Sequence, residues 1–352
     1  MAKICSNILL IICGCSSTES PRDTPIPVPP LLGADVSALE RIEQAGGVFR
    51  SGRQPGDALA ILRARGSNLF RLRLFVNPNG QEVQVNDLAY TIRMATRVKA
   101  AGATLLLDLH CSDTWADPGH QDTPAAWVSL DIDALEQQVE TYTADVITQL
   151  KQAGALPDIV QVGNEIDGGM LWPLGQLSYG SDSLASWDRF TRLLKAGISG
   201  LQSALGPGDT VRVMLHYSQG GNSGGTQWFF DHLDARGVSY DLIGLSYYPW
   251  WHGTLLSLKA NLNATALRFN RDVICGGDVL PLAGRWLGIH SDEPGSDDLG
   301  GLSNGTGGVP AGCARRGGNG AQRARCRGSL VVSGVDRGSR ALYLGRRIAC
   351  PV

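Results

Sequence analysis

Between residues 31 and 275, short apolar runs alternate with longer stretches in which apolar residues recur at helical spacing. The apolar runs have the length of β-strands and cover residues 31–36, 69–76, 104–110, 158–165, 211–216 and 241–248. The helical pattern covers residues 57–66, 88–102, 131–154, 186–205 and 254–270, and three of these segments end on glycine, as helices often do. Six strand–helix units in series predict parallel strands, either in a TIM barrel or in a doubly wound sheet.

The positions of the polar residues favour the barrel. TIM barrels assemble their active sites at the carboxyl ends of several strands. A dinucleotide-binding sheet would instead need a turn of the form G-x-G-x-x-G after its first strand, and the segment GADVSALERIE lacks it. The expected fold is therefore α/β, a TIM (β/α)8 barrel. The chemically capable residues at predicted strand ends are Asp35, Asn77, His110, Asp113, Asn164, Glu165, His216, Tyr247 and Tyr248.

Size and charge limit the classes of function and of partner that are expected. A chain of 352 residues, 43% of them hydrophobic, can bury the core of one large domain, and we expect it to act as a monomer. The formal net charge is -2, and no cluster of Lys and Arg with interleaved aromatic residues occurs in the first 270 residues. Such a chain has no basic surplus to neutralise phosphates, so we do not expect a nucleic acid as partner.

The first thirty residues have the composition of an export signal followed by a tether. Lys3 precedes the apolar run ILLII and then CGC, so residues 1–15 resemble a bacterial lipoprotein signal in which Cys15 carries the lipid anchor. The apolar run is too short to span a bilayer. Residues 16–30, rich in Ser, Thr and Pro, indicate an extended linker. We expect an exported protein, periplasmic or attached to the cell surface, and a plain secretory signal is the alternative.

A metal site has weaker sequence support than sugar chemistry. His110 with Asp113, and His216, could gather a divalent ion at the barrel mouth. The chain has neither an H-x-H pair nor an H-E-x-x-H motif, and an isolated His at a strand end more often hydrogen-bonds a substrate or a neighbour. We therefore expect no cofactor and no metal.

Glu165 and the tryptophans indicate sugar chemistry. Glycosidic cleavage usually needs two carboxyl groups, one of them kept protonated so that it can donate to the leaving oxygen. Glu165 ends an apolar run in VQVGNEIDGGMLWP, and Asn164 before it can hydrogen-bond a sugar hydroxyl. Core packing would explain any single Trp, but five at predicted loops or strand ends favour stacking on sugar rings. They are Trp115, Trp172, Trp228, Trp250 and Trp251.

Five longer motifs carry a family resemblance. The segments GSNLFRLRLFVNP, LLLDLHCSDTWADPGHQ, VQVGNEIDGGMLWP, MLHYSQGGNSGGTQWFFDHL and DLIGLSYYPWWHGTLLSLKANL occur in this order. They resemble consecutive strand ends of glycoside hydrolase family 53, the endo-β-1,4-galactanases that cut type I arabinogalactan, a pectin side chain. The resemblance covers residues 33 to 274, and it implies a retaining (β/α)8 enzyme with a polysaccharide substrate.

The same resemblance implies roles for individual residues. Glu165 would be the general acid/base, and Asn164 would hold the sugar at the cleavage point. Arg71 or Arg73, which share one strand face, would orient the nucleophile. Turn formation is the alternative for Asp113 and for Asp117. Bacterial relatives often carry calcium in a late loop, but no matching loop is visible here. The residues expected to line the cleft are His110, Ser112, Asp113, Trp115, His216 and Tyr247.

The nucleophile that the resemblance implies is missing. The family places it at the end of the seventh strand, in a pattern like V-E-T-x-Y-P-W, but here RDVI is followed by CGGDVLPLAGRW. A shift of reading frame explains this difference. The codons TGC GGT GGA GAC GTC CTA CCC CTG GCG encode CGGDVLPLA, and without their first base they read Ala-Val-Glu-Thr-Ser-Tyr-Pro-Trp. We therefore expect the chain to leave its ancestral frame near Ile274.

The composition of residues 275–352 supports the same interpretation. This tail is rich in Gly, Arg, Ser and Cys and lacks helical or strand periodicity over most of its length. We expect a barrel domain over residues 31–274, strands seven and eight missing or disrupted, and a disordered tail. A genuine basic extension that binds an anionic surface is the alternative. Two functions follow: an exported galactanase that is weak or dead as written, or a catalytically dead galactan-binding remnant or misfolded product.

Overall fold

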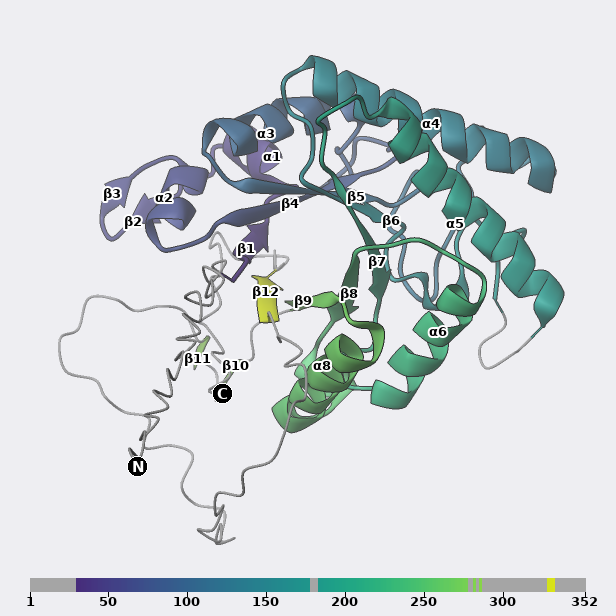
Figure 1. The fold of residues 1–352 in the computed structure, drawn as a ribbon. Coiled ribbons are helices and arrows are strands. Elements are labelled where there is room, and N and C mark those ends of the chain that lie inside the picture. Colours follow the sequence, from purple (N-terminus) through teal and green to yellow (C-terminus); the bar gives the residue numbers. More distant parts are fainter. Residues whose placement is uncertain (1–29, 178–182, 278–280, 283–284, 287–327, 333–352) are drawn as a thin grey trace, which may run out of the picture.

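The computed structural model describes residues 30–177, 183–277, 281–282, 285–286 and 328–332. Eight parallel strands form a closed barrel, and helices cover its outer side (Figure 1). This confirms the predicted TIM barrel. In spatial order around the barrel the strands are β1 (Leu32–Asp35), β12 (Gly328–Val332), β9 (Asp272–Gly277), β8 (Leu242–Ser246), β7 (Arg212–Tyr217), β6 (Ile159–Val162), β5 (Thr104–Leu109) and β4 (Leu69–Leu74).

The helices alternate with these strands along the chain, as the sequence predicts. They are α1 (Leu39–Gln44), α2 (Ala58–Ala64), α3 (Leu88–Ala100), α4 (Ile132–Gln152), α5 (Leu184–Ala204), α6 (Ser223–Ala235), α7 (Pro249–His252) and α8 (Leu255–Phe269). A short 3-10 helix, η1 (Ile166–Gly168), follows β6, and two-residue strands form small hairpins at β2 (Arg50–Ser51) with β3 (Gln54–Pro55) and at β10 (Pro281–Leu282) with β11 (Arg285–Trp286). None of the helices in the described residues is long and apolar enough to cross a membrane.

Side chains of the strands alternate between the barrel interior and the helix layer. One set fills the lower barrel, and it consists of Leu69, Leu106, Ile159, Met214, Leu242 and Ile274. Neighbours such as Phe70, Leu107 and Val160 join the larger core between strands and helices. The strands β4, β5, β6, β7 and β8 are thus buried on both faces over most of their length, which explains why their sequences are continuous apolar runs. Above the filled layer the inward positions become polar and form the site described below.

Local sequence signals set the ends of several helices. Asp57, Asp87 and Asp131 each precede a helix and accept a hydrogen bond from a backbone N–H in its first turn. The same three helices are followed by glycines with positive φ. This left-handed conformation ends a helix, and glycine adopts it without steric strain because it has no Cβ atom. These are Gly66, Gly102 and Gly154, with φ of 97°, 65° and 68°. The predicted glycine stops of α2, α3 and α4 are confirmed.

The structure differs from expectation at the seventh and eighth strand positions. β9 pairs with β8 in parallel from Asp272 to Gly276, so the seventh strand extends beyond residue 274. β12 pairs with β9 and β1, so these strands leave no open edge in the ring. Strand ladders consist of backbone hydrogen bonds, so the short apolar run SLVV can form one without any family motif. Most of the tail, the leader and most of the linker lie outside the described residues.

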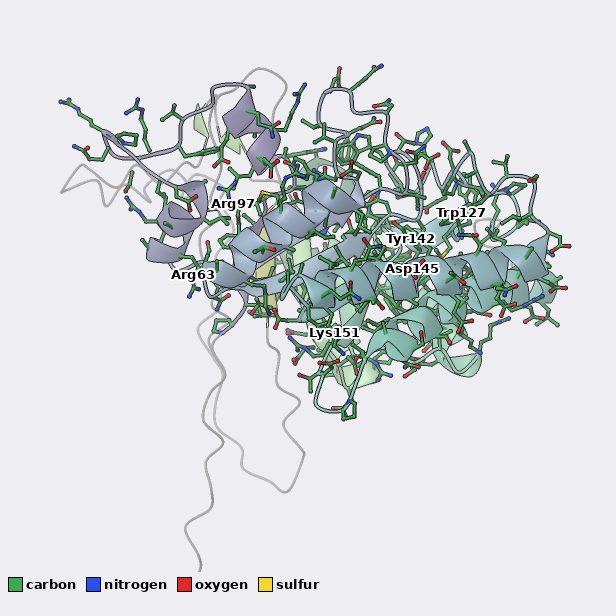
Figure 2. All side chains as sticks on the ribbon, turned by 90° about the horizontal axis from the view of Figure 1, so that it is seen from above. Arg63, Arg97, Trp127, Tyr142, Asp145 and Lys151 are labelled. Carbon is green, nitrogen blue, oxygen red and sulfur yellow. The ribbon has the colours of Figure 1, made fainter. Side chains whose placement is uncertain are left out.

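Helices α4 and α5 form the most extensive helix pair, and glycines allow their close approach. Figure 2 shows the side chains of α4, with Tyr142 near Trp127 and with Asp145 and Lys151 further along; Asp145 and Lys151 are exposed. The rings of Trp127 and Tyr142 meet edge to face at 5.3 Å. On the side of α4 that meets α5, a Cβ atom at Gly200 would lie 2.2 Å from the carbonyl oxygen of Glu140. Only glycine fits this crossing point.

We therefore expect Gly200→Ala to destabilise the barrel although alanine favours helices. The substitution should lower the free energy of unfolding by about 1–3 kcal/mol, since the two backbones must move apart. Gly224→Ala in the first turn of α6 is the matched control, because its Cβ would have 3.8 Å to the nearest atom. The control should be neutral or slightly stabilising. Urea unfolding of both variants measures this, and equal stabilities would contradict the packing argument.

Candidate active site

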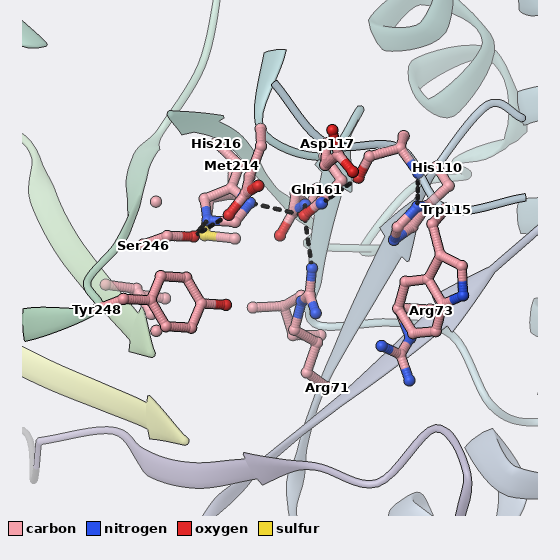
Figure 3. A pocket seen from close by; sticks show the side chains of 17 residues that line it. Arg71, Arg73, His110, Trp115, Asp117, Gln161, Met214, His216, Ser246 and Tyr248 are labelled. Atoms are coloured by element: carbon pink, nitrogen blue, oxygen red, sulfur yellow. Dashed lines mark hydrogen bonds between the residues drawn. The ribbon is translucent and has the colours of Figure 1, made fainter. Parts of the chain in front are cut away.

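A cavity of about 270 Å³ opens at the carboxyl ends of the strands. Figure 3 shows the side chains of its walls, which come from strands far apart in the sequence. Seven of the residues predicted for the site line it, namely Arg71, Arg73, His110, Trp115, Asn164, Glu165 and His216. The other lining residues are Leu106, Ala116, Asp117, Gln161, Met214, Gly244, Ser246, Tyr248, Ile274 and Gly276.

The loop after β6 brings Glu165 to the cavity through an unusual backbone. Gly163 and Glu165 both have positive φ, 78° and 48°, and a non-glycine residue in this region is typical of functional sites. The side chain of Gln121 stabilises the turn because its Nε2 donates to the carbonyl oxygens of Asn164 at 2.8 Å and of Glu165 at 3.2 Å. The strained turn is therefore braced from the loop after β5, and it aims Glu165 into the cavity.

Arg71 on β4 connects three other strands. Its guanidinium donates to Asp35 at 2.8 Å on β1, to Asp108 at 2.6 Å on β5 and to the amide oxygen of Asn164 at 2.8 Å after β6. A guanidinium has donors only, so these three oxygens fix its plane. Arg71 thus sets the position of Asn164, and with it the residue next to Glu165.

The buried charges around Arg71 compensate one another. Burial opposes ionisation of Asp35, but the positive charges of Arg73 and Arg71 outweigh it and hold the pKa of Asp35 near 2. The pKa of Asp108 is likewise held below its usual value, against the effect of burial, chiefly by Arg71 and His110. Two carboxylates therefore face two guanidinium groups at the bottom of the site, and the network remains charged and rigid at neutral pH.

Arg73, His110 and Trp115 form one wall of the cavity. The guanidinium of Arg73 lies over the indole of Trp115, 4.1 Å from the ring centroid. Phe75 packs edge to face against both the indole, at 5.7 Å, and the imidazole of His110, at 5.1 Å. The backbone N–H of Ala116 donates to Nδ1 of His110, which leaves Nε2 to carry the proton toward Asp108, 2.9 Å away. The wall offers an aromatic side chain held between fixed neighbours.

Glu165 is a carboxyl group poised near neutrality. Burial raises its pKa to about 7, and a hydrogen bond that the Ser246 hydroxyl donated to the ionised carboxylate would oppose that shift. The Ser246 hydroxyl oxygen lies 2.5 Å from Oε1 of Glu165. A carboxyl group with such a pKa carries a proton below pH 7 and can donate it, as an acid catalyst must.

Asp167 does not provide a second carboxylate for the cavity. It follows Glu165 by two residues, and burial raises its pKa to about 6. Both of its oxygens are engaged by Ser218, one with the backbone N–H at 2.7 Å and one with the hydroxyl at 2.6 Å. Asp167 therefore ties η1 to the end of β7, and among the described residues the carboxylates that line the cavity are Asp117 and Glu165.

Glycines occupy the end of β9, where the resemblance would place the second carboxyl group. β9 presents Gly276 to the cavity, and Gly276 pairs with Ser246 of β8, the residue that contacts Glu165. Gly277, the position at which the shifted reading gives Glu, ends the same strand. Three other carboxylates of the tail, Asp278, Asp292 and Glu293, lie outside the described residues. The described wall thus carries no carboxylate on β9.

Three of the predicted cleft residues lie elsewhere. Ser112 is buried, and its hydroxyl accepts from the backbone N–H of Thr114. The two oxygens of Asp113 accept from the backbone N–H groups of Asn77 and Ala125, so the turn-forming alternative holds for Asp113. The hydroxyl of Tyr247 donates to the carbonyl oxygen of Gly253, and its ring packs against α8. Tyr247 follows the inward-facing Ser246 and so turns away from the cavity.

Tyr248, Gln161 and Asp117 line the cavity although the sequence analysis gave them no substrate-contacting role. Tyr248 takes the place expected for its neighbour Tyr247, and the two-residue period of β8 could have indicated this because Gly244 and Ser246 also face inward. Gln161 lies within a strand, where the search for strand-end residues could not find it. Asp117 forms a turn and also lines the cavity. Its Oδ1 accepts a hydrogen bond from the backbone N–H of Gly119.

The tryptophans divide between the site and other roles. Trp115 lines the cavity, and Trp172 bonds through its indole N–H to the carbonyl oxygen of Gly168. Trp228 packs on α6 against Trp187, so packing explains it. Trp250 and Trp251 are 49% and 73% exposed on α7, next to the cavity residue Tyr248. In the part of the chain that the structure describes, no cluster of three His, Cys, Asp or Glu residues is arranged to hold a metal ion.

Comparisons with known proteins agree with the fold and with the cavity. Residues 31–281 match the sequence model of Glycosyl hydrolase family 53. A protein of Niallia circulans described as "Uncharacterized protein in bgaB 5'region" is 43% identical over 245 residues, which are 69% of this chain and 65% of that protein. A probable arabinogalactan endo-beta-1,4-galactanase A of Aspergillus terreus is 39% identical over 260 residues, 71% of each chain.

Solved structures give the same assignment. The catalytic domain of a family 53 protein from Ignisphaera aggregans superposes with a TM-score of 0.66 at 32% identity, covering 74% of this chain and 71% of that one. A fungal beta-1,4-galactanase superposes with a TM-score of 0.65 at 33% identity, covering 71% and 74%. The sequence match, the barrel and the cavity agree. The chain therefore belongs to glycosyl hydrolase family 53, and the glycosidase predicted from its sequence is confirmed.

Proposed function

We propose that the fold of this chain is that of an endo-acting retaining galactanase that cleaves β-1,4-galactosidic bonds in type I arabinogalactan. The observation that carries the proposal is Glu165, a half-buried carboxyl with a pKa near 7 at the wall of a sugar-sized cavity. The names of the fungal relatives support the choice of substrate. Glu165 would donate its proton to the leaving glycosidic oxygen and later take a proton from water.

The neighbours of Glu165 suit the binding of a sugar beside it. The amide of Asn164 donates one N–H to the carbonyl oxygen of Ala116 at 2.7 Å, and its second N–H can donate to a sugar hydroxyl. The indole of Trp115, backed by Arg73, offers a flat apolar surface on which a pyranose ring can stack. His216 is neutral at working pH, since burial and the charge of Arg71 lower its pKa to about 3. These side chains can orient the sugar without adding charge.

The second half of the retaining mechanism lacks its nucleophile in this chain. A retaining glycosidase forms a covalent bond between the sugar and a second carboxylate, and Gly276 and Gly277 occupy the end of β9 where the resemblance implies one. We propose that this chain is weak or inactive because it leaves its ancestral frame near Ile274. In support, the family match ends at residue 281 although the chain continues to residue 352.

The alternative is a protein that holds galactan without cutting it. The stacking surface of Trp115, the free N–H of Asn164 and the exposed rings of Trp250 and Trp251 remain without a nucleophile. Such a remnant would bind insoluble galactan, and Glu165→Gln would leave that binding unchanged. We also propose that the chain is an exported monomer, anchored to lipid through Cys15 or secreted, as its first thirty residues suggest.

The first prediction for this function uses an external anion in place of the missing carboxylate. Sodium formate should speed galactan cleavage by about tenfold or more, a gain of about 1.4 kcal/mol in the barrier, because formate can attack the sugar beside Gly276. Glu165→Gln should abolish this gain, while Glu82→Gln, at an exposed site outside the cavity, should not. Release of galacto-oligosaccharides is the measurement. Release without formate at the rate of an intact relative would contradict the loss of the nucleophile.

The second prediction concerns stability and needs no turnover. The raised pKa of Glu165, about 7 in the folded chain, means that its half-buried carboxyl favours folding while protonated and that this stability is lost as pH rises through 7. Glu165→Gln keeps the uncharged shape, so it should match the parent at pH 4 and exceed it by roughly 2–3 kcal/mol at pH 8. Urea unfolding at both pH values tests this. Equal stabilities at pH 8 would show that Glu165 is not held in a proton-retaining site.

The third prediction concerns the gene. Sequencing the DNA that encodes Asn270 to Gly300 should reveal a missing or extra base, and its correction should restore a Val-Glu-Thr-x-Tyr-Pro-Trp reading. A confirmed frame as written would refute the frame change. The alternative of a galactan-binding remnant would then be the better account.

A further inference from the structure

A chain of hydrogen bonds leads from Arg71 to the side of Glu165 that faces the protein. The oxygen of Ser246 lies 2.5 Å from Oε1 of Glu165 and 3.0 Å from Nε2 of His216. Nδ1 of the same imidazole lies 2.8 Å from the amide oxygen of Asn164, which also accepts from Arg71. Figure 3 shows Ser246 and His216 side by side at the cavity wall. The protons in this series of hydrogen bonds can be placed by counting donors and acceptors.

The orientation of the Asn164 amide is fixed by its other partners. Its oxygen accepts from the guanidinium of Arg71 at 2.8 Å and from Nε2 of Gln161 at 3.1 Å. Its nitrogen donates to the carbonyl oxygen of Ala116 at 2.7 Å. Arginine can only donate and a carbonyl can only accept, so exchanging the amide oxygen and nitrogen would break both contacts. An acceptor therefore faces His216.

This fixed amide decides which imidazole nitrogen carries the proton. Nδ1 of His216 must donate to the oxygen of Asn164, because two acceptors 2.8 Å apart would repel. The neutral imidazole then has a bare Nε2, which faces the hydroxyl of Ser246. Burial and the charge of Arg71 lower the pKa of His216 to about 3, in agreement with a neutral ring.

Ser246 has one hydroxyl proton and two neighbours that can accept it. If Glu165 is ionised, its Oε1 and Nε2 of His216 compete for that proton, and one of them stays without a donor in a buried place. If Glu165 is protonated, it can donate to the oxygen of Ser246 while Ser246 donates to Nε2 of His216. Nε2 of His216, the hydroxyl of Ser246 and Oε1 of Glu165 then each have a hydrogen-bond partner.

We propose that Ser246 and His216 are positioning residues that keep Glu165 in its proton-carrying form, with the Ser246 hydroxyl donating to His216 and accepting from Glu165. This inference rests on the proposed role of Glu165 as the acid. When Glu165 gives its proton to the leaving oxygen of the sugar, the Ser246 hydroxyl rotates to donate to the new carboxylate. Nε2 of His216 then loses its donor, and this imbalance favours the return of a proton from water to Glu165.

The other charged groups around these hydrogen bonds agree with a neutral His216 and a protonated Glu165. Around His216 lie Arg71, Asp108 and His110, of which Arg71 and His110 oppose a charged ring. Around Glu165 lie Asp167, Arg71 and Asp117, and the two carboxylates favour the protonated form. β8 and β9 contribute only Gly244, Ser246, Ile274 and Gly276 to the cavity wall, which carry no charge.

Nitrogen NMR of the histidine rings tests the first step directly. The chain has six histidines, and His216→Phe, which keeps a ring of similar shape, identifies the signal of His216 by its loss. We expect the tautomer with the proton on Nδ1, unchanged between pH 5 and pH 9. A proton on Nε2, or a ring that becomes charged in this range, would overturn the proposal.

Titration of Glu165 tests the second step. Carbon NMR of labelled glutamate, assigned with Glu165→Gln, gives the pKa of this carboxyl in the parent and in three variants. Ser246→Ala removes the acceptor of its proton, and His216→Phe releases the Ser246 hydroxyl to donate to the carboxylate, so both should lower the pKa. Ser246→Thr keeps the hydroxyl and should restore a value close to that of the parent.

The opposite result has a clear meaning. If Ser246 only donates to an ionised Glu165, then Ser246→Ala should raise the pKa and His216→Phe should leave it unchanged, and the proposal is wrong. The tautomer signal of the parent chain keeps the test decisive if a variant fails to fold. Neither measurement needs turnover, so the rate of galactan cleavage tests the proposed function without deciding this inference.

Discussion

The guanidinium of Arg71 is the constraint on which the site depends. It joins β4 to β1, β5 and the turn after β6 through Asp35, Asp108 and Asn164. Because Asp35 and Asp108 carry the compensating charges, the cluster can stay ionised although it is buried. The rest follows in order: the fixed amide of Asn164 selects the tautomer of His216, and the tautomer determines what Ser246 can offer to Glu165. A charge pair near the barrel floor thus influences a proton at its mouth.

One half of the catalytic machinery of a retaining glycosidase is present in this chain, and the other half is missing. The acid half consists of Glu165 in a strained turn, supported by bonds from Gln121 and the Arg71 cluster. These supporting residues all lie in the part of the chain from β1 to β8. The nucleophile belongs to β9, whose backbone pairs normally although it ends in glycines. Strand pairing depends on the backbone and catalysis depends on side chains, so a barrel can keep its shape where its chemistry is lost.

The sequence predicts most of the fold because six apolar runs and their helices obey simple periodicities. It also predicts the inward cluster of Arg71, Arg73, His110, Asn164 and Glu165, since strand ends meet at one face and the motifs are long. Three kinds of residue escape such reasoning. The sequence predicted Tyr247 for the cleft, but its neighbour Tyr248 lines the cavity. Gln161 lies inside a strand, and β12 forms in a segment without periodicity. Each depends on tertiary pairing, which local patterns do not contain.

The most direct test of the central claim compares the chain as written with a variant in which residues 275–282 read Ala-Val-Glu-Thr-Ser-Tyr-Pro-Trp. The readout is the rate at which each releases galacto-oligosaccharides from galactan at pH 6, where Glu165 is protonated. The account predicts little release by the chain as written and a large gain in the variant, lost again when Glu165→Gln is added. Equal activity of the two chains would contradict it, because the glycines at the end of β9 would then not limit catalysis.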